Sequence, residues 1–107
     1  MTAQEKIIKL SELRNMLEEQ GNEEFLSFID ELRYHLINLV YGIDVGRAIM
    51  YKKNNQALLV QDVALKYSNG EYKLDIYTID CNGKAHTDTV SKVSDRFYTM
   101  DTVQNHW

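Results

Sequence analysis

Residues 63–84 read VALKYSNGEYKLDIYTIDCNGK, and this stretch decides the fold of the C-terminal half of the chain. Apolar and polar residues alternate along it, which is typical of β-strands. Two Asn-Gly dipeptides, at 69–70 and 82–83, interrupt the alternation. Asn-Gly between alternating runs is the strongest short-range signal for a β-hairpin, because both residues tolerate the positive φ angles of a type I′ turn. The stretch therefore predicts two consecutive hairpins, which together form a meander.

A two-residue turn also determines which residues face each other across a hairpin. The first turn places Ser68 opposite Glu71, and the second places Cys81 opposite Lys84. A weaker turn signal at 54–55, Asn-Asn, predicts one more hairpin before these two. The sequence thus predicts four strands, which span residues 47–53, 56–68, 71–81 and 84–91.

This register predicts apolar residues on both faces of the sheet. The core face is expected to hold Val63, Leu65, Tyr67, Tyr72, Leu74 and Ile76. The opposite face is expected to hold Ile49, Tyr51, Leu58, Val60, Tyr77 and Ile79. A sheet that is covered on one side only has one apolar face, so the second face needs a cover of its own.

Two different parts could cover the second face. One is the C-terminal segment, in which apolar residues recur at helical spacing, namely Phe97, Met100, Val103 and Trp107. That segment has an alternative structure, a fifth strand over 96–101, because its aromatic residues also favour sheets. The other cover is a second copy of the chain. We expect this homodimer, because Trp107 is the last residue of the sequence and chain ends anchor poorly.

The N-terminal part of the chain predicts two helices. Thr2 and Glu5 form the pattern of a capping box, in which each side chain bonds a backbone N–H of the first turn. A first helix is expected over 3–20 and a second over 23–41, each with an apolar stripe at helical spacing. Because one or two residues join them, the helices must be antiparallel neighbours whose inner faces cover the sheet.

The fold class is therefore α+β: an antiparallel helix hairpin packed on a four- or five-stranded antiparallel β-meander, with a short C-terminal helix as an option. At 107 residues the chain has the size of a single domain, with the hairpin in 1–42 and the meander with the C-terminal segment in 43–107.

The distribution of charge limits the partners. The chain has a net charge of -4, and residues 1–42 contain eight acidic and four basic residues, so the whole excess lies in the predicted hairpin. Binding to nucleic acid requires clustered Lys and Arg, and only Lys52, Lys53 and Arg47 approach this pattern, so nucleic acid is disfavoured. No stretch is apolar enough to span a bilayer or to form a signal peptide. The single cysteine, Cys81, fits a reducing compartment, so we expect a cytoplasmic protein.

The sequence contains no pattern that predicts catalysis. It has no glycine-rich phosphate loop, and its three histidines, His35, His86 and His106, lack the spacing of a metal site. Cys81 has no histidine placed to activate it, because His86 is offset from it in the expected pairing. We therefore predict no enzyme activity, no catalytic residues, no metal and no cofactor.

Binding is the leading hypothesis for function. Four acids surround the expected turn between the helices, and they could dock on a basic surface: Glu18, Glu19, Glu23 and Glu24. Three tyrosines are further candidates for partner contact, since tyrosine is enriched at interfaces: Tyr51, Tyr77 and Tyr98. Together these features predict a small protein that occupies a surface of a macromolecular partner, of the inhibitor, immunity or adaptor type. Small proteins of phages and mobile elements often have this profile.

The alternative hypothesis is a pocket for a small molecule between the helix hairpin and a curved sheet, which would sequester its ligand or turn it over. Its polar contacts would come from Arg47, His35, Tyr51 and Tyr77.

Overall fold

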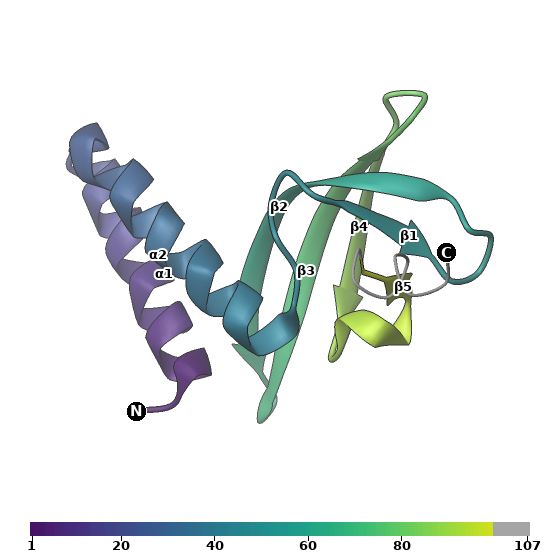
Figure 1. Ribbon diagram of the computed structural model, residues 1–107. Helices are drawn as coiled ribbons and strands as arrows, with labels where there is room; N and C mark the ends of the chain where they lie inside the picture. Colours follow the sequence, from purple (N-terminus) through teal and green to yellow (C-terminus); the bar gives the residue numbers. More distant parts are fainter. Residues whose placement is uncertain (100–107) are drawn as a thin grey trace.

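The computed structural model describes residues 1–99 of the chain, and it has the predicted α+β architecture (Figure 1). Helices α1 (Ala3–Glu19) and α2 (Glu23–Tyr41) form an antiparallel hairpin. The strands are β1 (Ala48–Tyr51), β2 (Ala57–Ser68), β3 (Glu71–Asp80), β4 (Ala85–Val90) and β5 (Phe97–Tyr98), with a 3-10 turn η1 (Val93–Asp95) before β5. They form one antiparallel sheet in the order β4-β3-β2-β1-β5.

The helices begin and end where the sequence predicts. The Thr2 hydroxyl accepts the Glu5 backbone N–H at 3.1 Å, so the predicted N-terminal cap of α1 is confirmed. The second helix has the expected bounds and stops at Gly42. An ion pair joins the two helices, since Arg14 Nε donates to Asp30 Oδ1 at 2.8 Å. Within residues 1–99, neither helix has both the length and the apolar composition needed to cross a membrane.

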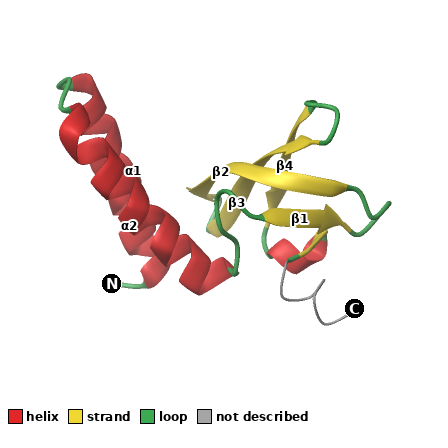
Figure 2. Ribbon diagram, turned by 45° about the horizontal axis from the view of Figure 1, so that its top comes forward, coloured by secondary structure: helices red, strands yellow, loops and turns green. Residues whose placement is uncertain are grey.

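The hairpin covers the sheet with only part of its length. Figures 1 and 2 show that its base, where the N-terminus lies, packs against the sheet, whereas the α1–α2 turn stands away from it. At the base, Ile7 of α1 and Ile37 of α2 are completely buried in the same core as β2 and β3. The expectation that the inner helix faces cover the sheet therefore holds for the base alone.

The first Asn-Gly hairpin is confirmed in turn and register. Asn69 and Gly70 have φ angles of 53° and 77°, as a type I′ turn requires. Ser68 pairs with Glu71, and the pairing continues without a shift to Val63 and Ile76. Local turn chemistry was sufficient here because it agrees with the apolar pattern of both strands.

The second hairpin differs from the prediction by one residue. Ile79 pairs with Ala85, so Cys81, Asn82 and Gly83 form a three-residue loop and Cys81 does not face Lys84. The cause is the side chain of Asp80, whose Oδ1 accepts the backbone N–H groups of Asn82 at 2.9 Å and of Lys84 at 3.0 Å. These bonds stabilise a wider turn, in which only the glycine has a positive φ.

The prediction of a second apolar face on the sheet is wrong. The pairing of β2 with β3 shifts between Val60 and Asp62, which leaves Gln61 as the extra residue of a β-bulge. Because a shift of one residue reverses the direction of the side chains, Leu58 and Val60 lie on the same face as Val63. Four of the six residues expected on the second face are core residues instead, at 4% exposure or less: Ile49, Tyr51, Leu58 and Val60. Most of the expected second apolar face is therefore buried within the chain itself, and the homodimer stays a prediction.

The connection between β1 and β2 also differs from the expected two-residue turn. Tyr51 accepts the backbone N–H of Asn55 and donates its own to Gln56, so four residues, 52–55, form the loop. In consequence Leu58 pairs with Ile49, and not with Tyr51 as predicted.

In the part that the structure describes, the C-terminal segment forms a fifth strand, which is one of the two structures predicted for it. Strand β5 pairs with β1, and Phe97 stacks on Tyr51 with 5.1 Å between the ring centroids. Phe97 is 1% exposed, so this segment completes the core. Three residues of the predicted helical pattern lie outside the described residues: Met100, Val103 and Trp107.

Candidate functional site

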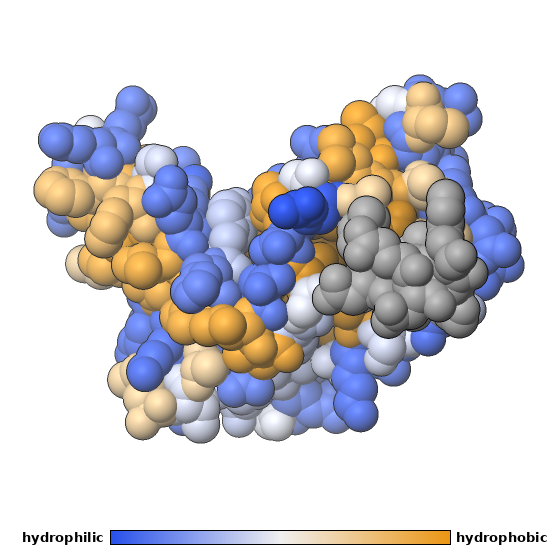
Figure 3. Space-filling view, in the orientation of Figure 1, coloured by the Kyte–Doolittle hydropathy of each residue, from blue (hydrophilic) through white to orange (hydrophobic). Residues whose placement is uncertain are grey.

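The helix hairpin exposes an apolar surface that nothing in the described chain covers. Its six members are between 40% and 67% exposed: Leu13, Met16, Phe25, Phe28, Leu32 and Leu39. We call this surface the hairpin face. Figure 3 shows the apolar side chains gathered over the two helices, beside the hollow that separates them from the sheet. Large exposed apolar patches commonly mark sites of interaction, so the hairpin face is a candidate functional site.

The hairpin face follows from the width of the apolar stripe on α2. Phe25, Phe28, Leu32 and Leu39 are spaced by three, four and seven residues and so share one side of the helix. The buried residue Ile37 lies on another side, which packs against the sheet at the hairpin base. Since the sheet covers only that side, the rest of the stripe remains exposed.

A groove runs along the hairpin face between the two helices, with a volume of about 400 Å³. Its walls are apolar and come from both helices: Leu10, Leu13, Leu32 and Leu36. Lys6, Lys9 and His35 also line the groove. The groove therefore presents aliphatic side chains to a ligand, with basic residues of α1 toward the hairpin base.

The four predicted acidic residues lie at the opposite end, at the turn between the helices. Glu18, Glu19, Glu23 and Glu24 are all exposed, as predicted for this tip. Of the four, Glu18 alone forms an ion pair within residues 1–99, with Arg14 at 2.8 Å. The acidic tip and the hairpin face are thus adjacent parts of one projecting element.

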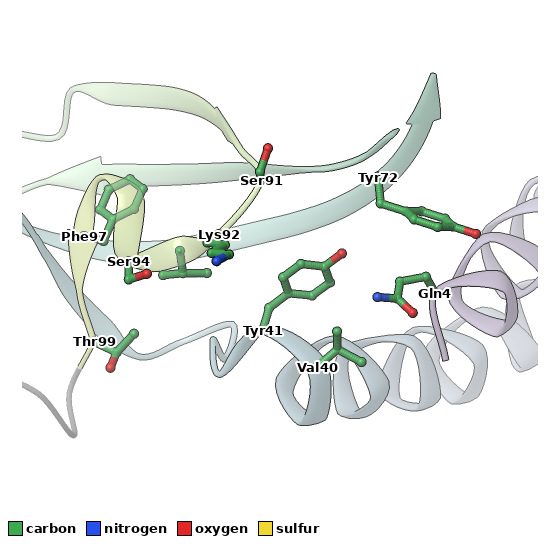
Figure 4. Close-up of a pocket in the computed structure, with 10 residues that line it drawn as sticks. Gln4, Val40, Tyr41, Tyr72, Ser91, Lys92, Ser94, Phe97 and Thr99 are labelled. Carbon is green, nitrogen blue, oxygen red and sulfur yellow. The ribbon is translucent and has the colours of Figure 1, made fainter. Parts of the chain in front are cut away.

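A second candidate site is a cleft between the base of the hairpin and the sheet, with a volume of about 570 Å³. Figure 4 shows Tyr41 and Tyr72 with their hydroxyl groups near the Gln4 side chain, and Ser91, Lys92 and Ser94 on the other side. Burial raises the pKa of the Tyr41 hydroxyl, and the neighbouring Gln4 amide partly offsets this rise. The cleft thus combines neutral hydrogen-bonding groups with one amine.

A cluster of polar groups lies on the inner face of the sheet, around Asp88. The Tyr51 hydroxyl donates to Asp88 Oδ2 at 2.6 Å, and Arg96 donates to Asp88 Oδ1 at 2.9 Å. Burial, together with the neighbouring Asp88 carboxylate, raises the pKa of Tyr51 to about 12. Tyr51 therefore remains protonated at neutral pH and acts as a hydrogen-bond donor, which does not suit a nucleophile or a general base.

A second acid of the same face supports the β3–β4 turn. Asp80 Oδ2 lies 2.9 Å from His86 Nε2 and accepts a hydrogen bond from Gln56 at 3.2 Å. The hydrogen bond from His86 is the largest cause of the lowered pKa of Asp80, followed by the bond from the Lys84 backbone. This carboxylate is engaged by four donors, so its observed role is structural.

The four residues of the predicted small-molecule pocket do not come together. His35 lies at the groove of the hairpin face, and Tyr51 lies in the core of the sheet. Tyr77 pairs with Asp62 on the opposite face of the sheet, and Arg47 is exposed just before β1. Of the three candidate interface tyrosines, Tyr51 is buried, whereas Tyr77 and Tyr98 are half-buried.

The sequence analysis expected the apolar stripes of both helices to be covered, so it did not identify the hairpin face as an interaction site. The available signal was the breadth of the α2 stripe, which exceeds what one packing contact can cover.

No protein-family model matches the sequence, and no curated protein or solved structure is significantly similar to it. Within residues 1–99, no group of three or more His, Cys, Asp or Glu side chains is arranged to hold a metal ion.

Proposed function

We propose that this chain is a small binding protein that docks on another protein through its hairpin face. The observation that carries the proposal is the exposure of large apolar side chains on both helices, for example 58% for Phe28 and 56% for Met16. Complete burial of a large apolar side chain is favourable by about 1.5–3 kcal/mol, and these side chains are about half exposed, so a partner must cover several of them to gain useful affinity.

The proposed occupant is an amphipathic helix of the partner. Two antiparallel helices leave a groove along their length, and an apolar groove of this kind accepts the apolar side of a third helix. Leu10, Leu13, Leu32 and Leu36 would contact that side.

The charge of the hairpin requires a basic partner. Residues 1–42 contain the entire net charge of -4, which disfavours the close approach of two copies of this hairpin and favours a partner with Lys and Arg beside its apolar stripe. The basic residues of the partner would lie near the acidic tip. Because a helix has a positive N-terminus, its N-terminal end would also point toward the tip, with its C-terminal end toward Lys6 and Lys9.

Occupation of a partner surface is sufficient for function, and it requires no catalytic group. An inhibitor, an immunity protein and an adaptor all act in this way. The groove supports this class of function, because leucines of both helices form its walls and can contact an apolar segment of a partner.

Two designed helical peptides test the proposal, both with leucines along one side and with lysines or glutamates along the other. The lysine peptide should bind the intact chain, and the combined change Phe28→Asp and Leu32→Asp should abolish binding. Leu59→Asp is the matched control, because Leu59 is 42% exposed on the sheet and distant in sequence from the hairpin. Circular dichroism checks that each variant is folded.

Three results would contradict the proposal: binding of neither peptide, equal binding of both, or equal loss of binding in the Leu59→Asp control. Sedimentation of the intact chain as a dimer that Phe28→Asp dissociates would instead assign the hairpin face to a second copy. Affinity capture from the native host, with the intact chain and the hairpin-face variant compared by mass spectrometry, would then identify the physiological partner.

The cleft of Figure 4 supports a second candidate function, the binding of a small molecule. Its volume of about 570 Å³ lies in the range of ligand sites, and its lining offers the Tyr41 hydroxyl, the Gln4 amide and the Lys92 amine. Native mass spectrometry of the protein from its host should then detect a bound compound, which Ser94→Trp should displace by filling the cleft. Detection of the unliganded mass alone contradicts this candidate.

A further inference from the structure

The loop between β1 and β2 faces β4 and the end of η1 across a pocket of about 450 Å³, which is separate from the hairpin face and from the cleft. It is lined by Tyr51, Lys52, Lys53, Asp88, Asp95 and Arg96. We call it the loop pocket. Three of its six lining residues are basic, in a protein whose net charge is -4.

Aromatic rings hold the two lysines of the loop pocket. Lys53 Nζ lies 4.5 Å from the centroid of the Tyr51 ring, and Lys52 Nζ lies 5.2 Å from that of Tyr98. These are cation–π contacts, which orient an ammonium group without neutralising its charge. Within residues 1–99, neither lysine forms an ion pair with a carboxylate. Among residues 1–99, therefore, no carboxylate pairs with either positive charge, which leaves both for an anion.

The acids of the loop pocket, in contrast, already have donors. Asp88 is 8% exposed and accepts hydrogen bonds from Tyr51 and Arg96. Asp95 Oδ2 accepts the backbone N–H of Lys92 at 3.2 Å. Arg96 donates to Asp88 through Nη1, and the other N–H groups of its guanidinium can donate to a second anion. The formal charges of the lining residues leave an excess of one positive charge.

From these contacts we infer that the loop pocket binds the oxyanion group of a small molecule, a phosphate or a carboxylate. Lys52 and Lys53 donate to the oxyanion, and Arg96 adds a directed N–H donor from the opposite wall. Tyr51 supports the site indirectly, since its hydroxyl bonds Asp88 and so reduces repulsion between that carboxylate and the ligand. This inference is independent of the proposed docking through the hairpin face.

Backbone ¹H–¹⁵N NMR titration of the intact chain tests the inference with three probes at equal ionic strength: inorganic phosphate, acetate and chloride. Saturable shifts should centre on the amides of residues 51–53 and 95–96. The combined change Lys52→Gln and Lys53→Gln should weaken binding by about tenfold or more, because charged hydrogen bonds to the ligand are lost. Lys84→Gln is the matched control, since Lys84 is exposed on the β3–β4 turn.

The three probes separate the possible sources of the oxyanion. Saturation by phosphate alone supports a phosphorylated ligand, by acetate alone a carboxylate ligand, and by both an unselective oxyanion site. Tyr51→Phe should weaken whichever oxyanion binds, while the fold remains intact by circular dichroism. The inference is overturned if no probe saturates, if chloride reproduces the shifts, or if Lys84→Gln weakens binding as much as the double change.

Discussion

The hydroxyl of Tyr34 donates to Asp62 Oδ1 at 2.6 Å, and this bond joins α2 to the residue that follows the bulge of β2. The same Oδ1 accepts the backbone N–H of Val63 at 2.9 Å. Beside it, Arg33 is 6% exposed and donates to the carbonyl of Val63 at 2.9 Å. The bulge thus supplies the polar groups that position the helix hairpin on the sheet.

Loss of the Tyr34–Asp62 bond should loosen this contact. We expect Tyr34→Phe to lower the free energy of unfolding by about 1 kcal/mol, because both side chains are partly exposed and water competes for the bond. A double-mutant cycle with Asp62→Ala, measured by urea unfolding, should show coupling of about 0.5 kcal/mol or more. Strict additivity of the two changes would mean that the bond contributes nothing.

The two Asn-Gly turns should respond differently to alanine. Asn69 has a φ of 53°, whereas the φ of Asn82 is not positive. Only Asn69→Ala therefore forces alanine into a strained left-handed conformation. We expect Asn69→Ala to lower the free energy of unfolding by about 1 kcal/mol and Asn82→Ala to cost clearly less. Thermal unfolding compares them directly, and equal shifts in Tm would contradict the three-residue turn at 81–83.

Two neighbouring residues of α2 should differ sharply in their contribution to stability. Ile37 is completely buried, whereas Leu39 on the hairpin face is 67% exposed. Ile37→Ala should cost about 2–5 kcal/mol because it leaves a cavity, and Leu39→Ala should change stability by about 0.5 kcal/mol or less. Chemical denaturation measures both, and a large loss in Leu39→Ala would show that another part of the protein covers the hairpin face.

The bonds to Asp80 should make stability depend on acidic pH. The folded-state pKa of Asp80 is lowered below its ordinary value of 3.8, mainly by the bond from His86. The stability that this carboxylate contributes is therefore complete above the unfolded pKa and is lost as the pH falls through the folded one.

Asp80→Asn removes this titration, so it should make the decline of Tm below about pH 4 less steep than in the intact protein. Glu23→Gln is the matched control, because Glu23 is exposed and its side chain forms no ion pair within residues 1–99. The assignment is wrong if both variants follow the acid profile of the intact protein.

Much of the fold could be predicted because its signals are local. The Thr2 cap and the apolar spacing located the helices, and the alternation around Asn69 and Gly70 gave the register of β2 with β3. These interactions form within a few residues of each other, so the order of residues alone specifies them. The acidic tip was equally accessible, since a short turn between helices must lie at an end of the hairpin.

The remaining features depend on contacts between distant segments, which only the tertiary structure decides. The bulge at Gln61 moved Leu58 and Val60 into the core, which also contains Phe97 of β5. The Asp80 carboxylate stabilises the three-residue turn by accepting the backbone N–H groups of Asn82 and Lys84, and these bonds form only when β3 and β4 are paired.

The hairpin face is the clearest example. A periodic stripe shows which side of a helix is apolar, but the extent of its burial depends on where the sheet ends relative to the helix. Phe28 and Ile37 both follow the apolar pattern of α2, yet one is 58% exposed and the other is completely buried. The sequence by itself determined the elements, their caps and one register, whereas packing in three dimensions decided which apolar residues remain free for a partner.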